Sequence, residues 1–103
     1  MFRSKQLAGK TAIITGCNRG IGREIMTLFA SEGASIIACV RKESSEFLEL
    51  IARISSQYDV AIEPLYFDMS DDESIKSAFK PLYQKKRNID VLVNNAGVAA
   101  GGM

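Results

Sequence analysis

Short apolar runs alternate with segments of helical periodicity along this chain. Residues 11–15, 35–40, 61–67 and 90–93 are rich in apolar side chains and are bounded by glycine or polar residues, as is typical of buried parallel strands. Between these runs, apolar residues recur three and four positions apart, as they do on one face of an amphipathic helix. The expected faces consist of Ile21, Ile25, Leu28 and Phe29; Phe47, Leu50, Ile51 and Ile54; and Ile75, Phe79, Leu82 and Tyr83. The alternation predicts a βαβ protein.

Glycine, proline and capping residues refine these predicted elements. Gly33 is placed to end the first helix, because glycine adopts the left-handed conformation without cost. Pro64 cannot donate a ladder hydrogen bond, which predicts that the third strand lies at an edge of the sheet or carries a bulge at the proline. Ser70 followed by Glu73 predicts a capping box at the start of the third helix. Pro81 predicts a kink or an early break in that helix.

Length, composition and charge exclude several classes of protein. The chain has 103 residues, of which 47% are hydrophobic, so it can bury one modest core but cannot form separate cofactor and substrate domains. A net charge of +1 provides no large field for nucleic acid or an anionic membrane. The chain contains no His and only two Cys, which excludes His-dependent nucleophile triads and the usual zinc spacings. The two cysteines and the absence of an apolar leader favour a reducing, cytoplasmic location.

The sharpest motif is the stretch Thr-Gly-Cys-Asn-Arg-Gly-Ile-Gly at residues 15–22, between the first predicted strand and the first predicted helix. Its G-x3-G-x-G spacing suits a backbone that turns sharply and brings a helix N-terminus close to a phosphate. A tight turn without a ligand is the alternative interpretation. The motif is not a P-loop, because Arg23 and Glu24 follow it where a P-loop has Lys and Ser or Thr.

Together with Asn-Asn-Ala-Gly at residues 94–97, this glycine motif resembles the short-chain dehydrogenase/reductase family, in the branch similar to the 3-oxoacyl-carrier-protein reductases. The resemblance extends over essentially the whole chain. It implies a Rossmann-type, doubly wound parallel α/β sheet with strand order 3-2-1-4. It also implies that residues 1–103 are the N-terminal part of a single NADP-binding domain, truncated after the fourth strand.

The end of the second predicted strand indicates which nicotinamide cofactor is bound. At this place in a doubly wound sheet, a carboxylate binds the 2′-hydroxyl of NAD, whereas a guanidinium binds the 2′-phosphate of NADP. The chain has Val40 and Arg41 here, and the resemblance places Arg19 on the same side. We therefore expect NADP(H). The alternative is that both arginines are ordinary surface residues, and that Glu43 neutralises Arg41.

The resemblance also implies the remaining cofactor contacts. Asp68 and the Met69 backbone would contact the adenine, although Asp68 could simply belong to the turn before the third helix. Asn95 would border the ribose, while Asn94 would be structural. Cys17 and Cys39 are interpreted as small packing residues. The full predicted cofactor set is Gly16, Cys17, Asn18, Arg19, Gly20, Ile21, Gly22, Arg41, Asp68, Met69, Asn95, Ala96 and Gly97.

The family's catalytic Ser and Tyr-x-x-x-Lys pair follow the Asn-Asn-Ala-Gly motif, and the chain has none of them. Its three tyrosines are followed four residues later by other side chains: Tyr58 by Ile62, Tyr66 by Ser70, and Tyr83 by Arg87. We therefore expect the cofactor-binding part of an oxidoreductase that moves a hydride between NADP(H) and a small carbonyl or alcohol substrate, and no catalysis by this segment alone. The resemblance also implies a homotetrameric parent.

Two alternatives from other classes stay open. One is a short non-catalytic module that binds NADP(H) or assembles with another chain, against which the exposed apolar edge at residues 91–93 argues. The other is an α/β interaction domain that binds no nucleotide. The substrate stays open among 3-oxoacyl thioesters, steroids, sugars and small ketones.

Overall fold

The computed structural model describes residues 5–95 of the chain. Strands and helices alternate throughout, as the apolar pattern predicts. They are β1 (Thr11–Thr15), α1 (Gly20–Ser31), β2 (Ser35–Val40), α2 (Ser45–Tyr58), β3 (Ile62–Tyr66), α3 (Asp72–Gln84) and β4 (Val91–Val93). β3 and β4 are each shorter than expected, because residues 61, 67 and 90 lie just outside the ladders.

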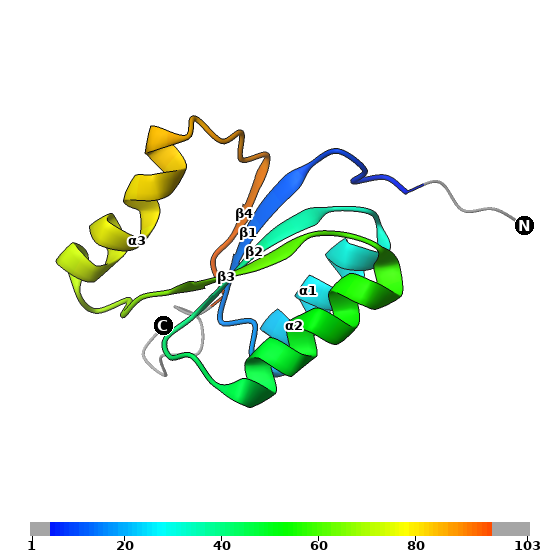
Figure 1. The fold of residues 1–103 in the computed structure, drawn as a ribbon, viewed down its shortest axis with the longest axis horizontal. Coiled ribbons are helices and arrows are strands. Elements are labelled where there is room, and N and C mark those ends of the chain that lie inside the picture. The colour runs from blue at the N-terminus through cyan, green and yellow to red at the C-terminus, as the bar shows by residue number, and fades with distance from the viewer. Residues whose placement is uncertain (1–4, 96–103) are drawn as a thin grey trace, which may run out of the picture.

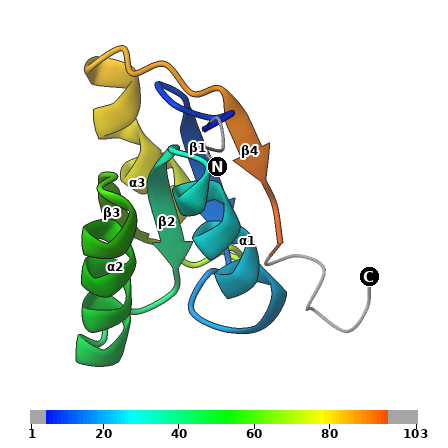
Figure 2. The same ribbon diagram turned by 90° about the vertical axis from the view of Figure 1, so that its right-hand side faces the viewer.

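The strands form one parallel sheet in the order β3-β2-β1-β4, which confirms the predicted Rossmann-type topology. β1 is central, and its Ala12 is in register with Ile36 of β2 on one side and Val91 of β4 on the other. β3 lies at an edge, as Pro64 predicts. Figures 1 and 2 show α1 and α2 on one face of the sheet and α3 on the other. Because all four strands run in the same direction, the loops after β1, β2 and β3 meet at the end of the sheet formed by the carboxyl ends of the strands.

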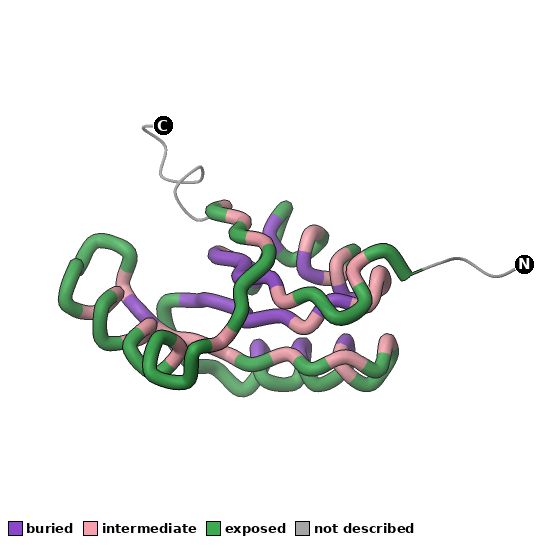
Figure 3. Tube along the Cα trace, turned by 90° about the horizontal axis from the view of Figure 1, so that it is seen from above, coloured by how far each residue is buried: buried purple, intermediate pink, exposed green. Residues whose placement is uncertain are grey.

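Two hydrophobic clusters hold these layers together. The larger one lies between the sheet and the α1–α2 layer, and it contains the whole predicted face of α2, which is buried as expected. The smaller one lies under α3 and consists of Ile13, Ile37, Cys39 and Phe67. Figure 3 shows the buried positions gathered along the central strands and on the inner sides of α1 and α2. Burial therefore concentrates on the side of the sheet that supports the glycine loop.

The apolar face expected for α1 is only partly correct. Ile21 and Leu28 are 65% and 54% exposed, whereas Ile25 and Phe29 are partly buried against the larger cluster. The buried residues of this helix recur at every fourth position: Gly22, Met26 and Ala30. Small side chains let the helix axis approach the sheet closely, and a pattern based on large apolar residues does not detect them. The helix ends as expected, with Gly33 at a φ of 94° just beyond the cap.

The start of α3 differs from the predicted capping box by one residue. Asp71 is the N-cap, and its Oδ1 accepts hydrogen bonds from the backbone N–H groups of Glu73 and Ser74 at 3.0 and 3.4 Å. Ser70 instead donates its hydroxyl to Oδ1 of Asp68 at 2.7 Å. Both residues are good N-caps, and the neighbouring Asp68 decides between them because it occupies the serine hydroxyl.

Pro81 does not end α3, contrary to the possibility of an early break. The helix continues to Gln84, and the carbonyl of Pro81 accepts a hydrogen bond from Lys85 N at 3.1 Å. Tyr83, expected on the buried face, is 78% exposed, and no residue of α3 is fully buried. α3 is therefore the most loosely packed of the three helices described. In the part of the chain that the structure covers, no helix has the length and apolarity needed to span a membrane.

Candidate functional site

The loop between β1 and α1 depends on its glycines. Gly16 and Gly20 have φ values of 64° and 62°, in the left-handed region that side chains with a Cβ rarely adopt. Gly22 is required for a different reason: a Cβ at this position would collide with the carbonyl oxygen of Gly16 and lie 2.7 Å from Nδ2 of Asn95. A Cβ on Gly20, by contrast, would meet no protein atom within 4 Å. The loop is thus tightly packed at Gly22, against Gly16 and Asn95, whereas the space next to Gly20 is open.

The N-terminus of α1 lacks the groups that cap the other two helices. Its N-cap residue, Arg19, makes no side-chain cap hydrogen bond, and its first turn contains no acidic residue. In contrast, α2 is capped by Ser44 and α3 by Asp71, and both of these helices have acidic residues in the first turn. The first N–H groups of a helix carry a partial positive charge and need acceptors. At α1, an anion in front of the loop can supply the acceptors that side chains do not.

A cleft of about 610 Å³ lies at the carboxyl ends of β1, β2 and β3, next to this loop. Its lining combines apolar surface from the ends of β2 and β3 with basic and polar side chains from the loops. The residues are Thr15, Gly16, Asn18, Arg19, Cys39, Val40, Arg41, Lys42, Ser44, Phe67, Asp68, Met69 and Ser70. The apolar part of this lining can contact a flat apolar group, and the basic part can bind an anion attached to it.

Arg41 and Asp68 meet across the cleft. Nη2 of Arg41 lies 3.5 Å from Oδ2 of Asp68, and both side chains are partly exposed. The other carboxylate oxygen of Asp68 accepts hydrogen bonds from Ser70, from N at 2.9 Å and from Oγ at 2.7 Å. These bonds from Ser70, followed by the charge of Arg41, lower the pKa of the Asp68 carboxyl below its usual value. Asp68 therefore builds the turn before α3, the structural alternative expected from the sequence, and also lines the cleft.

The two asparagines after β4 tie that strand to β1. Thr15 Oγ1 lies 3.2 Å from Oδ1 of Asn94, and it accepts a hydrogen bond from Asn95 N at 2.9 Å. Nδ2 of Asn95 donates to the carbonyl of Gly16 at 3.4 Å. Asn94 thus has the structural position expected for it, while Asn95 contacts the glycine loop itself. The next two predicted residues, Ala96 and Gly97, lie outside the described part of the chain.

Cys17 turns its side chain into the core rather than into the cleft. The residue has no exposed surface, and its Sγ donates a hydrogen bond to the carbonyl of Ile14 at 3.1 Å. Burial raises the pKa of the Cys17 thiol to about 12, so the thiol stays protonated near neutral pH. Cys39 is also buried. Both cysteines therefore behave as the small packing residues that the sequence indicates.

The cleft brings together six of the thirteen predicted cofactor residues: Gly16, Asn18, Arg19, Arg41, Asp68 and Met69. Gly22 and Asn95 support the loop from behind, and Gly20 lies at its open front, but Cys17 and Ile21 do not line the cleft. The predicted set omitted the other residues that line the cleft, which are Thr15, Cys39, Val40, Lys42, Ser44, Phe67 and Ser70. Lys42 could have been found as a second cation directly after Arg41, and Phe67 as the apolar residue before Asp68. Among residues 5–95, no group of three or more His, Cys, Asp or Glu side chains is arranged to hold a metal ion.

Comparisons with known proteins agree with this architecture. Residues 10–103 match the family model for short chain dehydrogenases. The chain is 37% identical over 94 residues to the 3-oxoacyl-acyl-carrier-protein reductase of Aquifex aeolicus, covering 90% of this chain and 37% of the relative. It is 35% identical over 96 residues to the NADP-dependent 3-hydroxy acid dehydrogenase of Schizosaccharomyces pombe, covering 93% of this chain and 37% of the relative. The crystal structure of L-sorbose reductase from Gluconobacter frateurii, solved with NADPH and L-sorbose, superimposes with a TM-score of 0.78 at 28% identity, covering 90% of this chain and 35% of that one.

The glycine loop that leads into an uncapped helix and the parallel 3-2-1-4 sheet define a Rossmann-type α/β fold. The chain belongs to the short-chain dehydrogenase family, to which its sequence shows a clear resemblance. It spans about a third of the length of most of the curated relatives that it matches.

Proposed function

We propose that this chain binds the adenosine and pyrophosphate portions of NADP(H) within an oxidoreductase that transfers a hydride between the cofactor and a small carbonyl or alcohol substrate. The observation that carries the proposal is the N-terminus of α1, which has neither a side-chain cap nor an acidic first turn, directly behind the loop of residues 16–22. The pyrophosphate would accept hydrogen bonds from the N–H groups of this first turn. The open space in front of Gly20 lets the phosphate approach the backbone. The nicotinamide, when bound, supplies the hydride chemistry.

The basic residues around the cleft favour NADP(H) over NAD(H). Arg19, Arg41 and Lys42 all line it, and Val40 at the end of β2 offers no carboxylate to a ribose 2′-hydroxyl. A guanidinium binds a phosphate through paired, charge-assisted hydrogen bonds, so Arg41 and Arg19 are the expected ligands of the 2′-phosphate. Support also comes from the relative whose name specifies NADP and from the related reductase solved with NADPH.

The remaining contacts in this proposal follow from position. Asp68 and the Met69 backbone would contact the adenine, and both line the cleft together with Phe67. Asn95 holds the loop through its bond to the Gly16 carbonyl and would border the ribose, and Ala96 and Gly97 are proposed to contribute to the same contact. The buried Gly22 keeps α1 close enough for its N-terminus to reach the pyrophosphate.

The proton-transfer residues of the reaction would come from outside these 103 residues, which contain no Tyr-x-x-x-Lys pair. The segment alone is therefore proposed to bind cofactor without catalysing.

Reduction of a 3-oxoacyl thioester is one candidate reaction, because relatives named as 3-oxoacyl-acyl-carrier-protein reductases are 37% and 38% identical to the chain. A homotetrameric, cytoplasmic parent enzyme completes the proposal. The alternative, a short non-catalytic module that binds NADP(H) or assembles with another chain, predicts the same cofactor binding without turnover.

The test is a pair of dissociation constants, for NADPH and NADH, measured by calorimetry on the natural protein that carries these residues. Loss of charge-assisted hydrogen bonds predicts that Arg41→Asp weakens NADPH binding by about tenfold or more. The new carboxylate at the end of β2 can accept a hydrogen bond from a ribose 2′-hydroxyl, so the preference should shift towards NADH. Lys80→Glu is the charge-matched control, because it changes the net charge by the same amount, and Lys80 is exposed on α3 and does not line the cleft. Equal affinities for NADPH and NADH in the unaltered protein, or equal losses for both in the variant, would contradict the cofactor assignment.

A further inference from the structure

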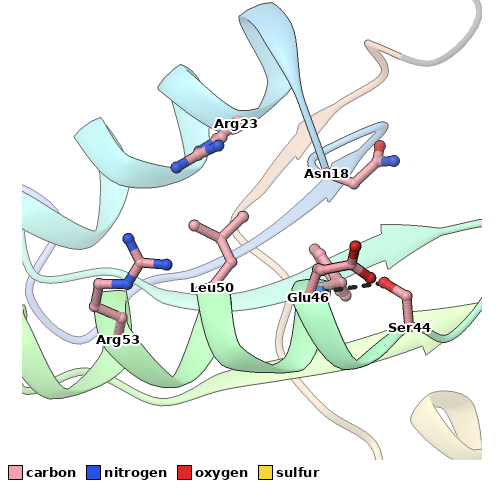
Figure 4. A pocket seen from close by; sticks show the side chains of 7 residues that line it. Asn18, Arg23, Ser44, Glu46, Leu50 and Arg53 are labelled. Atoms are coloured by element: carbon pink, nitrogen blue, oxygen red, sulfur yellow. Dashed lines mark hydrogen bonds between the residues drawn. The ribbon is translucent and has the colours of Figure 1, made fainter.

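A second pocket lies between α1 and α2, beside the cofactor cleft but distinct from it. Its volume is about 370 Å³, and two side chains, Asn18 and Ser44, line both pockets. Figure 4 shows the side chains of this pocket between the two helices. The full lining is Asn18, Arg23, Ser44, Glu46, Phe47, Leu50 and Arg53. Neither Arg23 nor Arg53 lines the proposed cofactor cleft.

Two guanidinium groups share one side of this pocket. Arg23 comes from α1 and Arg53 from α2, and Figure 4 places both on the same side of Leu50, with Ser44 and Glu46 on the other. The two salt bridges found within residues 5–95 involve other arginines, so neither guanidinium is paired with a carboxylate there. Two unpaired cations that line one concave surface raise its local potential and attract an anion.

The remaining lining suits a small oxyanion rather than an apolar ligand. Each guanidinium offers a planar fork of N–H donors, which matches a phosphate group, and two of them balance its double negative charge. The Asn18 amide can donate further hydrogen bonds, and so can the Ser44 hydroxyl, whose oxygen already accepts from Phe47 N at 3.1 Å. The Glu46 carboxylate lies on the other side of Leu50 and repels anions there, so the ligand should carry its negative charge only at the end that faces the two arginines.

We propose that this pocket is a second anion site, at which Arg23 and Arg53 bind a phosphate group, either as inorganic phosphate or as a small phosphate monoester. The site is additional to the pyrophosphate and 2′-phosphate positions proposed for NADP(H). Its two cations do not line the cofactor cleft, although Asn18 and Ser44 line both pockets.

The test uses the natural protein that carries these residues, first saturated with NADP⁺ so that the cofactor's own phosphates occupy the cleft. Inorganic phosphate and glycerol phosphate are then titrated separately, and the side-chain Nε–Hε signals of the arginines are followed by NMR. We expect the signals of Arg23 and Arg53 to shift in a saturable manner. Arg23→Gln and Arg53→Gln should each weaken phosphate binding by about tenfold, through the loss of charge-assisted hydrogen bonds. Glutamine is a good helix former, so both exposed positions retain their helices.

Lys80→Gln is the matched control for these variants, since it also removes one positive charge, but from the other face of the sheet. An unchanged phosphate affinity in this variant, with losses in both arginine variants, supports the site, and the ligand that binds more tightly distinguishes inorganic phosphate from a monoester. Absence of saturable binding, or equal losses in all three variants, overturns it. If NADP⁺ itself does not bind, the same titrations are made on the cofactor-free protein. There, weaker phosphate binding in Arg19→Gln would reveal phosphate bound at the glycine loop, whereas losses confined to the Arg23 and Arg53 variants identify the α1–α2 pocket.

Discussion

Arg41 and Asp68 form an ion pair of 3.5 Å between the loops that follow β2 and β3. The residue proposed to bind the 2′-phosphate of NADP(H) is therefore already beside a carboxylate when no cofactor is present. Ser70 keeps that carboxylate ionised, because its two hydrogen bonds lower the pKa of Asp68. A bound 2′-phosphate would have to compete with Asp68 for the guanidinium and would also lie close to a like charge.

Removing the charge of Asp68 should consequently strengthen NADPH binding. In Asp68→Asn the amide oxygen can still accept the bonds from Ser70, while Arg41 becomes free for the phosphate. Exposed ion pairs contribute about 0.2–1 kcal/mol, so we expect a gain of a few-fold in NADPH affinity and little change for NADH, measured by calorimetry. Asp59→Asn is the control, because Asp59 is exposed at the far end of α2, where asparagine also tolerates its φ of 56°. An unchanged or weaker NADPH affinity would contradict the competition between the 2′-phosphate and Asp68, and equal weakening of both cofactors would show that the adenine contact proposed for Asp68 needs its negative charge.

Gly22 and Gly20 should differ in what their replacement by alanine affects: folding stability for Gly22 and ligand binding for Gly20. Gly22→Ala places a methyl group against the Gly16 carbonyl and Asn95, where neither the backbone nor the tied asparagine can move freely. Overpacking of this kind costs about 1–3 kcal/mol, which we expect as a lower free energy of unfolding in urea. Retention of full stability in Gly22→Ala would contradict the close approach of α1 to β1.

Gly20→Ala should instead affect ligand binding more than packing. Its methyl group would meet no protein atom within 4 Å, so the stability cost is the left-handed backbone alone, about 1–2 kcal/mol. Gly9 provides the matched control, because it has a φ of 81°, is equally open, and lies outside the cleft. We expect Gly9→Ala and Gly20→Ala to lose similar stability, and only Gly20→Ala to lose NADPH affinity. Equal affinities in the two variants would mean that no phosphate approaches Gly20.

The strands themselves and the edge position of β3 could be predicted from strong, local signals, whereas the strand order was predicted through the resemblance to the family. The apolar runs of β1 and β2 are continuous, as strands buried on both faces require, and Pro64 marks β3 as an edge. The buried side of α1 was harder to predict, because Gly22 and Ala30 carry little hydrophobic signal although they allow the closest packing. The choice between Ser70 and Asp71 as N-cap of α3 depends on Asp68, which no capping pattern includes.

Individual residues of the cleft could be predicted from the sequence, but contacts between residues of different loops could not. The glycine positions and Arg41 follow from local spacing at a strand end, and Arg19 follows from the resemblance to the family. The pairing of Arg41 with Asp68 depends on the distance between two loops that are far apart in sequence, and so does the α1–α2 pocket formed around Arg23 and Arg53. Pattern analysis of one sequence does not supply such distances.

Pro81 should limit the stability of α3. Proline has no N–H to donate to the Ser77 carbonyl, and α3 has no fully buried residue to offset that loss. Pro81→Ala restores the donor, so we expect the free energy of unfolding in urea to rise by about 1–3 kcal/mol. Pro64→Ala, on the edge strand, is the control: it should lower stability slightly, by under about 1 kcal/mol, because the unfolded chain gains freedom. A loss of stability in both variants would show that the ring of Pro81 is itself needed for packing.

The two buried thiols should make the fold sensitive to alkaline pH. Burial raises the pKa values of Cys17 and Cys39 from 9.0 to about 12, and for Cys39 the nearby Cys17 adds to the effect. The folded chain therefore keeps both protons where the unfolded chain releases them. Their contribution to stability is complete below pH 9.0 and is lost as the pH rises from there towards about 12.

Two measurements check this behaviour. At about pH 8, a thiol reagent should modify the folded chain slowly and the urea-unfolded chain rapidly, since only the thiolate reacts. The free energy of unfolding should fall more steeply between about pH 9 and about pH 11 in the unaltered chain than in Cys39→Ala, whatever cavity the variant creates, because a cavity lowers stability at every pH. Fast modification of the folded chain, or parallel pH profiles for the two proteins, would contradict the burial of these thiols beneath the cleft.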